Sequence, residues 1–206
     1  MLPAVALLKA EHIDAVLLNL AEVLDYPQVY TAQRAAELCK KVNGADPASH
    51  ALTQALTHFA EFCDKHFENG ELAEHYTQLF DLKPVCTLHC SYHLLGDTYE
   101  RGALLAMLAG EMKSHHIAFT HDLPDYLPTL LRLAQKLDPG EERALLVFPI
   151  IVAGLTHICA ALQKIESPYR ELLVATQSWL EAFVPRCDVN VQLKHPQRPS
   201  HLPIVQ

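Results

Sequence analysis

Four residues with metal-binding side chains, Cys86, His89, Cys90 and His93, lie close together in this sequence. On a helix the two cysteines are four residues apart, as are the two histidines, so all four could share one broad face. Two thiolates and two imidazoles suit zinc or another borderline metal. However, structural zinc sites usually draw two ligands from each of two elements, because one helix rarely surrounds a tetrahedral ion. A metal- or haem-binding helical sensor is therefore the alternative hypothesis.

The sequence lacks the short motifs that mark the common enzyme classes. It has no G-x-S-x-G elbow, no H-E-x-x-H zinc helix, no G-x-x-x-x-G-K-[ST] phosphate loop and no G-x-G-x-x-G fingerprint. The Glu-x-x-His pattern of di-iron bundles is also missing. Among 24 acidic residues no spacing singles out a catalytic pair. We therefore expect a protein that is not an enzyme, and a small helical hydrolase or lyase is the less favoured interpretation.

Arg101 lies at the start of an apolar helical stripe, so its guanidinium enters a buried edge and needs a carboxylate or carbonyl partner. The candidate partners are Asp81, Asp97, Asp122 and Asp125. Such a pair is a structural tether between helices or part of a ligand contact.

The connector at 121–128 carries two prolines, two carboxylates and an aromatic ring. Prolines fix backbone angles, and carboxylates can cap free helix amides. With Asp125 as the N-cap, Pro128 would fall harmlessly in the first helical turn. The connector is then either a rigid helix start or a groove rim on which Asp122, Asp125 and Tyr126 face a basic peptide.

Helical periodicity dominates the rest of the chain. Abundant Leu and Ala with only seven glycines favour helix over sheet. Five apolar stripes follow the 3.6-residue period, from Ile13 to Leu24, Leu52 to His66, Leu105 to Met112, Leu127 to Leu137 and Leu172 to Phe183.

Capping residues before prolines predict helix starts at 46–47, 138–139 and 167–168, and capping-box spacing predicts starts at Asp97 and Asp138. The proline after Tyr26 should end the first helix. We predict an all-α fold, a single compact multi-helix bundle of about eight or nine helices.

Residues 1–184 should form this bundle, and residues 185–206, with four prolines, should form an extended or disordered tail.

The formal charge of −8 argues against nucleic acid as a partner and mildly favours a basic peptide. Six cysteines in no disulfide-like spacing suggest reduced thiols. The N-terminus lacks signal-peptide features, and the apolar run from Ala144 to Thr156 is too short to span a bilayer. We expect a cytoplasmic protein without direct membrane insertion.

Four sequence blocks together resemble the redox-enzyme maturation chaperones (NarJ/TorD/DmsD type). The likeness is greatest to the nitrate reductase molybdenum cofactor assembly chaperones (the delta subunit, NarJ-like). The blocks are L-x-x-V-L-D-Y-P ending at Pro27, Y-T-Q-L-F-D at 76–81, H-L-L-G-D-x-x-x-R-G at 93–102 and D-L-P-D-Y-L-P at 122–128. They span roughly the first two-thirds of the chain.

This resemblance implies an all-helical chaperone without catalytic activity. Family members bind the N-terminal segment of an apo molybdoenzyme catalytic subunit, from nitrate reductase or a related enzyme. They hold it until the molybdenum–bis(molybdopterin guanine dinucleotide) cofactor is inserted, and bind no cofactor stably themselves. The implied peptide-binding residues are Asp122, Pro124, Asp125 and Tyr126, with Arg101 and Tyr76 nearby.

Overall fold

The computed structural model describes residues 4–42, 46–68, 70–82, 86–118 and 123–186, with side chains from residue 10 onward. Its helices are α1 (Ala4–Leu24), α2 (Thr31–Val42), α3 (Pro47–His66), α4 (Glu71–Phe80), α5 (Cys90–Leu95), α6 (Tyr99–Ser114), α7 (Leu127–Lys136), α8 (Glu141–Leu146), the π-helical η1 (Val147–Val152), α9 (Ala153–Ala161) and α10 (Pro168–Phe183). Because α8, η1 and α9 run on as one helix, the described residues form nine helices. They contain no strand, only an isolated antiparallel bridge between His89 and Tyr126. The predicted all-α bundle is confirmed.

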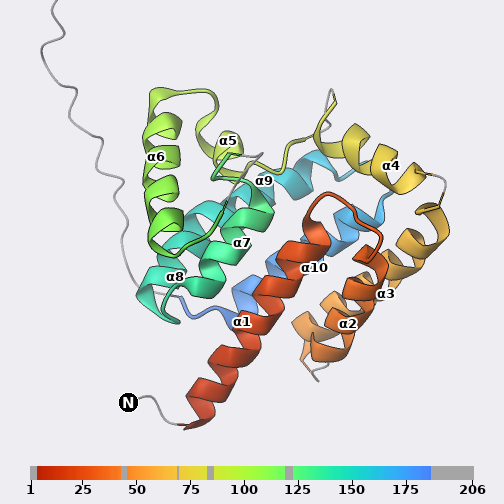
Figure 1. The fold of residues 1–206 in the computed structure, drawn as a ribbon, viewed down its shortest axis with the longest axis horizontal. Coiled ribbons are helices and arrows are strands. Elements are labelled where there is room, and N and C mark those ends of the chain that lie inside the picture. The colour runs from red at the N-terminus through yellow and green to blue at the C-terminus, as the bar shows by residue number, and fades with distance from the viewer. Residues whose placement is uncertain (1–3, 43–45, 69, 83–85, 119–122, 187–206) are drawn as a thin grey trace, which may run out of the picture.

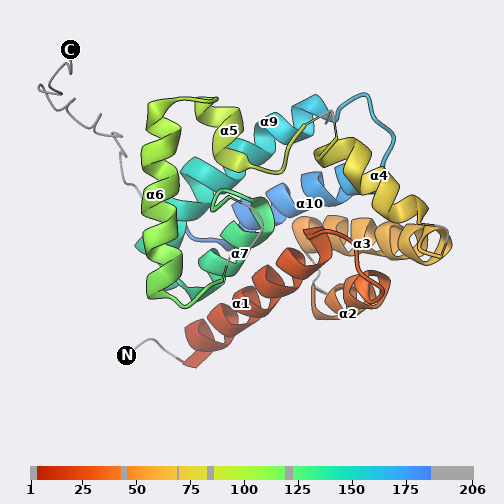
Figure 2. The ribbon, with the colours of Figure 1, turned by 45° about the horizontal axis from the view of Figure 1, so that its top comes forward.

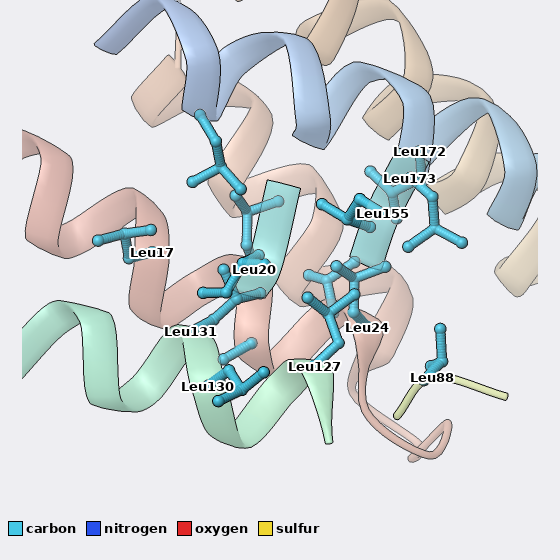
Figure 3. Close-up of a cluster of buried hydrophobic side chains, with 14 of the residues drawn as sticks. Leu17, Leu20, Leu24, Leu88, Leu127, Leu130, Leu131, Leu155, Leu172 and Leu173 are labelled. Carbon is cyan, nitrogen blue, oxygen red and sulfur yellow. The ribbon is translucent and has the colours of Figure 1, made fainter. Parts of the chain in front are cut away.

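Helices α1, α7 and α10 form the middle of the bundle, with α2, α3 and α4 on one side and α5, α6 and α9 on the other (Figures 1 and 2). Leucines from α1, α7, α9, α10 and the segment before α5 meet in the centre (Figure 3). They are Leu17, Leu20, Leu24, Leu88, Leu127, Leu130, Leu131, Leu155, Leu172 and Leu173, and none is more than 2% exposed. Each contributes about 1.5–3 kcal/mol by leaving water. The predicted stripes are therefore core faces, with only His66, Leu105 and Phe183 half-buried.

Two predicted helix starts are confirmed with their capping side chains. Asp46 Oδ1 accepts a hydrogen bond from Ser49 N (2.8 Å) at the start of α3. Ser167 Oγ accepts one from Tyr169 N (3.2 Å) at the start of α10. In each case a proline follows in the first turn, where its missing N–H costs nothing.

The other two predicted starts are displaced by one or two residues. Helix α6 is capped by Thr98, whose Oγ1 accepts from Arg101 N (3.3 Å), and not by Asp97. Helix α8 starts after Gly140 and not after Asp138. Before α8, the Arg143 guanidinium donates to the Leu137 carbonyl at 2.8 Å. These two capping signals thus locate the helix starts only to within one or two residues.

The continuous helix at 141–161 corrects one expectation. It has 21 residues and a mean hydropathy of 2.2 over its most apolar window, so by length and composition it is long enough to cross a membrane. Half of that window is buried inside the bundle, as expected of a core helix. The predicted run is shorter because it covers only 144–156, whereas the helix also includes 141–143 and 157–161. Pro149, which lacks an N–H, lies within η1, where the wider turn accommodates it.

Gly154 on α9 allows α5 to pack directly against that helix. A Cβ at position 154 would lie 2.6 Å from Cys90 Cβ and 2.9 Å from Cys90 Cα. Real Cβ atoms do not approach so closely, so only glycine fits here. Cys90, at the first position of α5, is fully buried against it.

Gly154→Ala should destabilise the fold by about 2 kcal/mol, because the overpacked methyl group forces α5 away from α9. Gly110, on α6, has nothing within 4 Å of a Cβ built on it, and supplies the control. Gly110→Ala should stabilise slightly, since alanine is the better helix former. Urea unfolding of both variants followed by circular dichroism measures the difference, and equal stabilities would contradict the packing argument.

Candidate functional site

The Asp125 carboxylate is fully buried and holds three other segments of the chain. It accepts hydrogen bonds from His89 Nδ1 (3.0 Å), Ser91 Oγ (2.5 Å) and the Arg101 guanidinium, whose Nε and Nη2 lie 3.2 and 3.1 Å away. A carboxylate only accepts, so His89 must carry its proton on Nδ1. The Arg101 guanidinium also lies 5.3 Å from the ring centre of Tyr92. We call Asp125, His89, Ser91 and Arg101 the Asp125 hub.

The hub keeps Asp125 ionised despite its burial. Burial raises the pKa of this carboxyl, but hydrogen bonds from His89 and Ser91 and the charges of His89 and Arg101 lower it further than burial raises it. The net pKa therefore lies below its usual value. A buried charge is tolerated only when it is paired and hydrogen-bonded in this way.

Backbone hydrogen bonds join the connector that carries Asp125 to the segment before α5. Cys90 N donates to Asp125 O, and Leu127 N donates to Leu88 O, both at 2.9 Å. Tyr126, the N-cap residue of α7, makes no side-chain cap. The prediction that Asp125 caps this helix is therefore wrong, because its carboxylate is engaged by the hub. Pro128 falls in the first turn as predicted.

Tyr126 connects the hub to the end of α1. Its hydroxyl lies 2.5 Å from the Tyr76 hydroxyl and donates to Asp25 Oδ1 at 3.2 Å. Asp25 Oδ1 also accepts from Tyr26 N (2.9 Å), and its Oδ2 accepts from Arg132 Nη2 (2.6 Å). Burial, followed by the neighbouring Tyr126, raises the pKa of Tyr76 well above its usual value, so this phenol is neutral. A second polar network, of Tyr76, Tyr126, Asp25 and Arg132, thus lies next to the hub and is joined to it through the Asp125–Tyr126 peptide.

At that surface lies a cleft of about 300 Å³ between the end of α1, the start of α2 and α7. Its lining residues are Glu22, Asp25, Tyr26, Gln28, Tyr30, Arg34 and Arg132. Tyr26 and Tyr30 are 44% and 48% exposed, and Val29 beside them is 76% exposed. The cleft therefore combines solvent-facing apolar surface with charged groups, as a ligand-binding surface requires.

The structure brings together four of the six residues that the resemblance implied. Arg101 pairs with Asp125 and Tyr76 with Tyr126, and the two pairs are joined because Asp125 and Tyr126 are neighbours in the chain. All four are buried, as is Pro124, so they do not form the open acidic rim that the sequence suggested. Asp122 lies outside the described residues. The partner of Arg101 is Asp125, one of four carboxylates proposed.

Sequence reasoning missed the residues that line the cleft. Asp25 appeared only as a letter of a family block, Tyr26 appeared there and as the residue before a helix-ending proline, and Arg132 carried no signal at all. The block that ends in Asp25-Tyr26-Pro27 could have pointed to this place, because an acid and an aromatic residue directly after a helix commonly end up near solvent.

The metal hypothesis depended on one helical face, and that face does not form. Cys86 and His89 precede α5, whose first residue is Cys90. His89 binds Asp125, and His93 Nε2 lies 2.7 Å from the Thr87 carbonyl. Burial raises the pKa of Cys86 to about 12 and that of Cys90 further, which disfavours thiolates. Within the described part of the chain, no group of three or more His, Cys, Asp or Glu side chains could hold a metal ion.

Comparison with known proteins gives a family match. The family model described as nitrate reductase delta subunit matches residues 45–187, more than half of the chain. This range includes the whole Asp125 hub, Tyr76 and Arg132. The α1 and α2 side of the cleft lies before it.

Two curated relatives, both named nitrate reductase-like protein NarX, come from two strains of Mycobacterium tuberculosis, CDC 1551 / Oshkosh and ATCC 25618 / H37Rv. Each is 29% identical over 155 residues, which cover 74% of this chain. The matched stretch is only 22% of the length of each relative, so the chain resembles a part of these longer proteins.

Asp125→Asn should destabilise the protein by about 3 kcal/mol at pH 7, because it leaves the buried Arg101 guanidinium without its counter-charge. The folded-state pKa of Asp125 is lowered, so its stabilisation is complete above the unfolded pKa of about 4 and is lost as the pH falls through the folded value. The difference between the two proteins should therefore shrink below about pH 4. Urea unfolding at a series of pH values tests this, with Asp97→Asn, an exposed carboxylate, as the control. A difference independent of pH would contradict the assignment.

Proposed function

The chain belongs to the nitrate reductase delta subunit family, and from that membership we propose that it is a cytoplasmic assembly chaperone for a molybdoenzyme. Its client is the apo catalytic subunit of nitrate reductase or a related enzyme, bound through the N-terminal segment and held while the molybdenum cofactor is inserted. The family match over residues 45–187 carries this proposal. The name of the mycobacterial relatives, nitrate reductase-like, agrees with it. The protein itself performs no catalysis and keeps no cofactor.

The client segment binds around the connector at 122–126 and along the cleft beside it. Apolar side chains of the segment pack on Tyr26, Val29 and Tyr30, which together expose the apolar surface at the cleft. Of the residues first implied, Asp122 is proposed to contact the segment, while the buried Pro124, Asp125, Tyr126, Arg101 and Tyr76 act from beneath by fixing the shape of the connector. A net charge of −8 attracts a basic segment over long range.

Release follows from competition between the chaperone and the client. The segment is exposed in the apo subunit and can dock on the chaperone. Once the cofactor is inserted, the client buries the same segment within its own fold, and the free segment is no longer present. Ordering a flexible segment offsets part of the contact energy, so the affinity should be moderate.

Co-purification tests the proposed function. The chaperone should capture an apo nitrate-reductase-like catalytic subunit, and it should lose most of that capture when the N-terminal segment is deleted. Cofactor-loaded subunit should be captured poorly, because its segment is buried. Equal capture of the full-length and truncated apo subunits would rule out binding through the segment.

Tyr30→Ala should weaken binding of the apo subunit about fivefold, because aromatic residues contribute most of the energy in such contacts. Tyr99→Ala supplies a matched control, since Tyr99 is 77% exposed at the start of α6, away from the cleft. Surface plasmon resonance with immobilised subunit measures both. If Tyr99→Ala weakened binding as much as Tyr30→Ala, the binding surface would lie elsewhere.

A further inference from the structure

We propose that the cleft at the end of α1 is a receptor for a guanidinium group, and that Asp25 and Glu22 select an arginine side chain in the bound segment. This inference rests on the proposed function for the identity of the segment, but its chemistry comes from the cleft alone. The sequence analysis instead expects Asp122 and Asp125 to be the carboxylates that face a basic peptide.

The end of α1 contributes negative charge to the cleft. A helix C-terminus carries the equivalent of about half a negative charge on its free carbonyls. Helices usually offset this charge with basic residues in the last turn, but α1 has none there. Instead Glu22 lies in the last turn and Asp25 follows directly after it. Two carboxylates at the negative end of a helix favour a cation over an anion.

The cleft already holds two guanidinium groups of the chain itself, each in a different binding mode. Arg132 of α7 donates Nη2 to Asp25 Oδ2 at 2.6 Å. Arg34 of α2 places Nε 3.2 Å from Glu22 Oε2, and its guanidinium carbon lies 5.8 Å from the ring centre of Tyr30. The walls therefore present both a carboxylate and an aromatic face at the positions that a guanidinium uses.

Both internal pairs are exposed enough to exchange. The side chains of Arg132 and Asp25 are 31% and 33% exposed, and those of Arg34 and Glu22 are 41% and 31% exposed. Pairs in contact with water are worth about 1 kcal/mol or less, so an incoming arginine can replace either internal arginine at small cost. This contrasts with the Arg101–Asp125 pair, whose side chains are 11% and 0% exposed and which has no such freedom.

Arg132 and Arg34 thus act as substitutes for the ligand. They neutralise Asp25 and Glu22 while the cleft is empty, and they move aside when a segment brings its own guanidinium. Asp25 keeps its hydrogen bonds to Tyr126 and to Tyr26 N during the exchange, so the carboxylate stays in place. Removing an internal arginine should then strengthen the binding of an external one.

A small probe tests this chemistry without the client. N-acetyl-arginine amide, titrated into the full chain and followed by NMR, should shift the ring signals of Tyr26 and Tyr30. N-acetyl-citrulline amide, which has the same shape but no charge, should not shift them. The fit measures the dissociation constant of the arginine derivative.

Arg132→Gln should tighten binding of the arginine derivative about fivefold, because it frees Asp25. Asp25→Asn should weaken binding of the arginine derivative about fivefold. Glu22→Gln should weaken it as well, and this variant leaves the hydrogen bond between Tyr126 and Asp25 in place. Two variants far from the cleft control for net charge: Lys113→Gln and Glu111→Gln, both on exposed positions of α6, should leave binding unchanged.

Equal shifts with arginine and citrulline derivatives, or no tightening in Arg132→Gln, would overturn the guanidinium receptor. The proposed function would still stand if the apo subunit were captured through its N-terminal segment. Conversely, arginine-selective binding at Tyr26 and Tyr30 without such capture would leave the receptor standing and reject the client. A negative result in either experiment therefore leaves the other proposal standing.

Discussion

The buried charge of Asp125 is the constraint on which the site depends. A carboxylate without solvent must receive several donors at once, and here they come from the segment before α5, from α5 itself and from α6. These segments, together with the connector before α7, are therefore held in one arrangement, because the loss of any donor leaves part of the charge unpaired. The same arrangement orients Tyr126, whose hydroxyl reaches Asp25 at the surface. A single desolvated charge thus fixes the connector from which Tyr126 reaches the cleft.

Positioning and binding are divided between two sets of residues. The Asp125 hub is closely hydrogen-bonded and buried except for the half-buried His89, which suits a support and not a contact surface. The cleft is half-exposed, its ion pairs face water, and its tyrosine rings are open to solvent. This division suits the proposed function, in which a fixed shape must go together with ready release of the client. Strong interactions shape the cleft, and weak ones face water.

Local signals in the sequence predicted the helices well and the site only in part. Asp46 and Ser167 cap their helices as predicted because each side chain reaches an amide of its own first turn. Asp125 has the same local signal but serves three distant donors, and no local rule reveals that competition. The charge of Arg101 limited its candidate partners to four nearby carboxylates, but only the folded structure shows which of the four it contacts. The cleft brings residues 22–34 together with Arg132, which is about a hundred positions away in the sequence. The spacing of residues along the chain could therefore not predict that they line one cleft.

The contact between Gly154 and Cys90 has a consequence for evolution. Helix α5 carries Ser91 toward the hub, and it can do so only because α9 offers no side chain at position 154. Glycine at position 90 would not make room, because the Cα of residue 90 would still lie 2.9 Å from a Cβ at position 154. A relative with alanine at position 154 must therefore have a shifted α5 and a different partner for Asp125. Position 154 lies outside the cleft, yet it should stay glycine in homologues that keep this geometry.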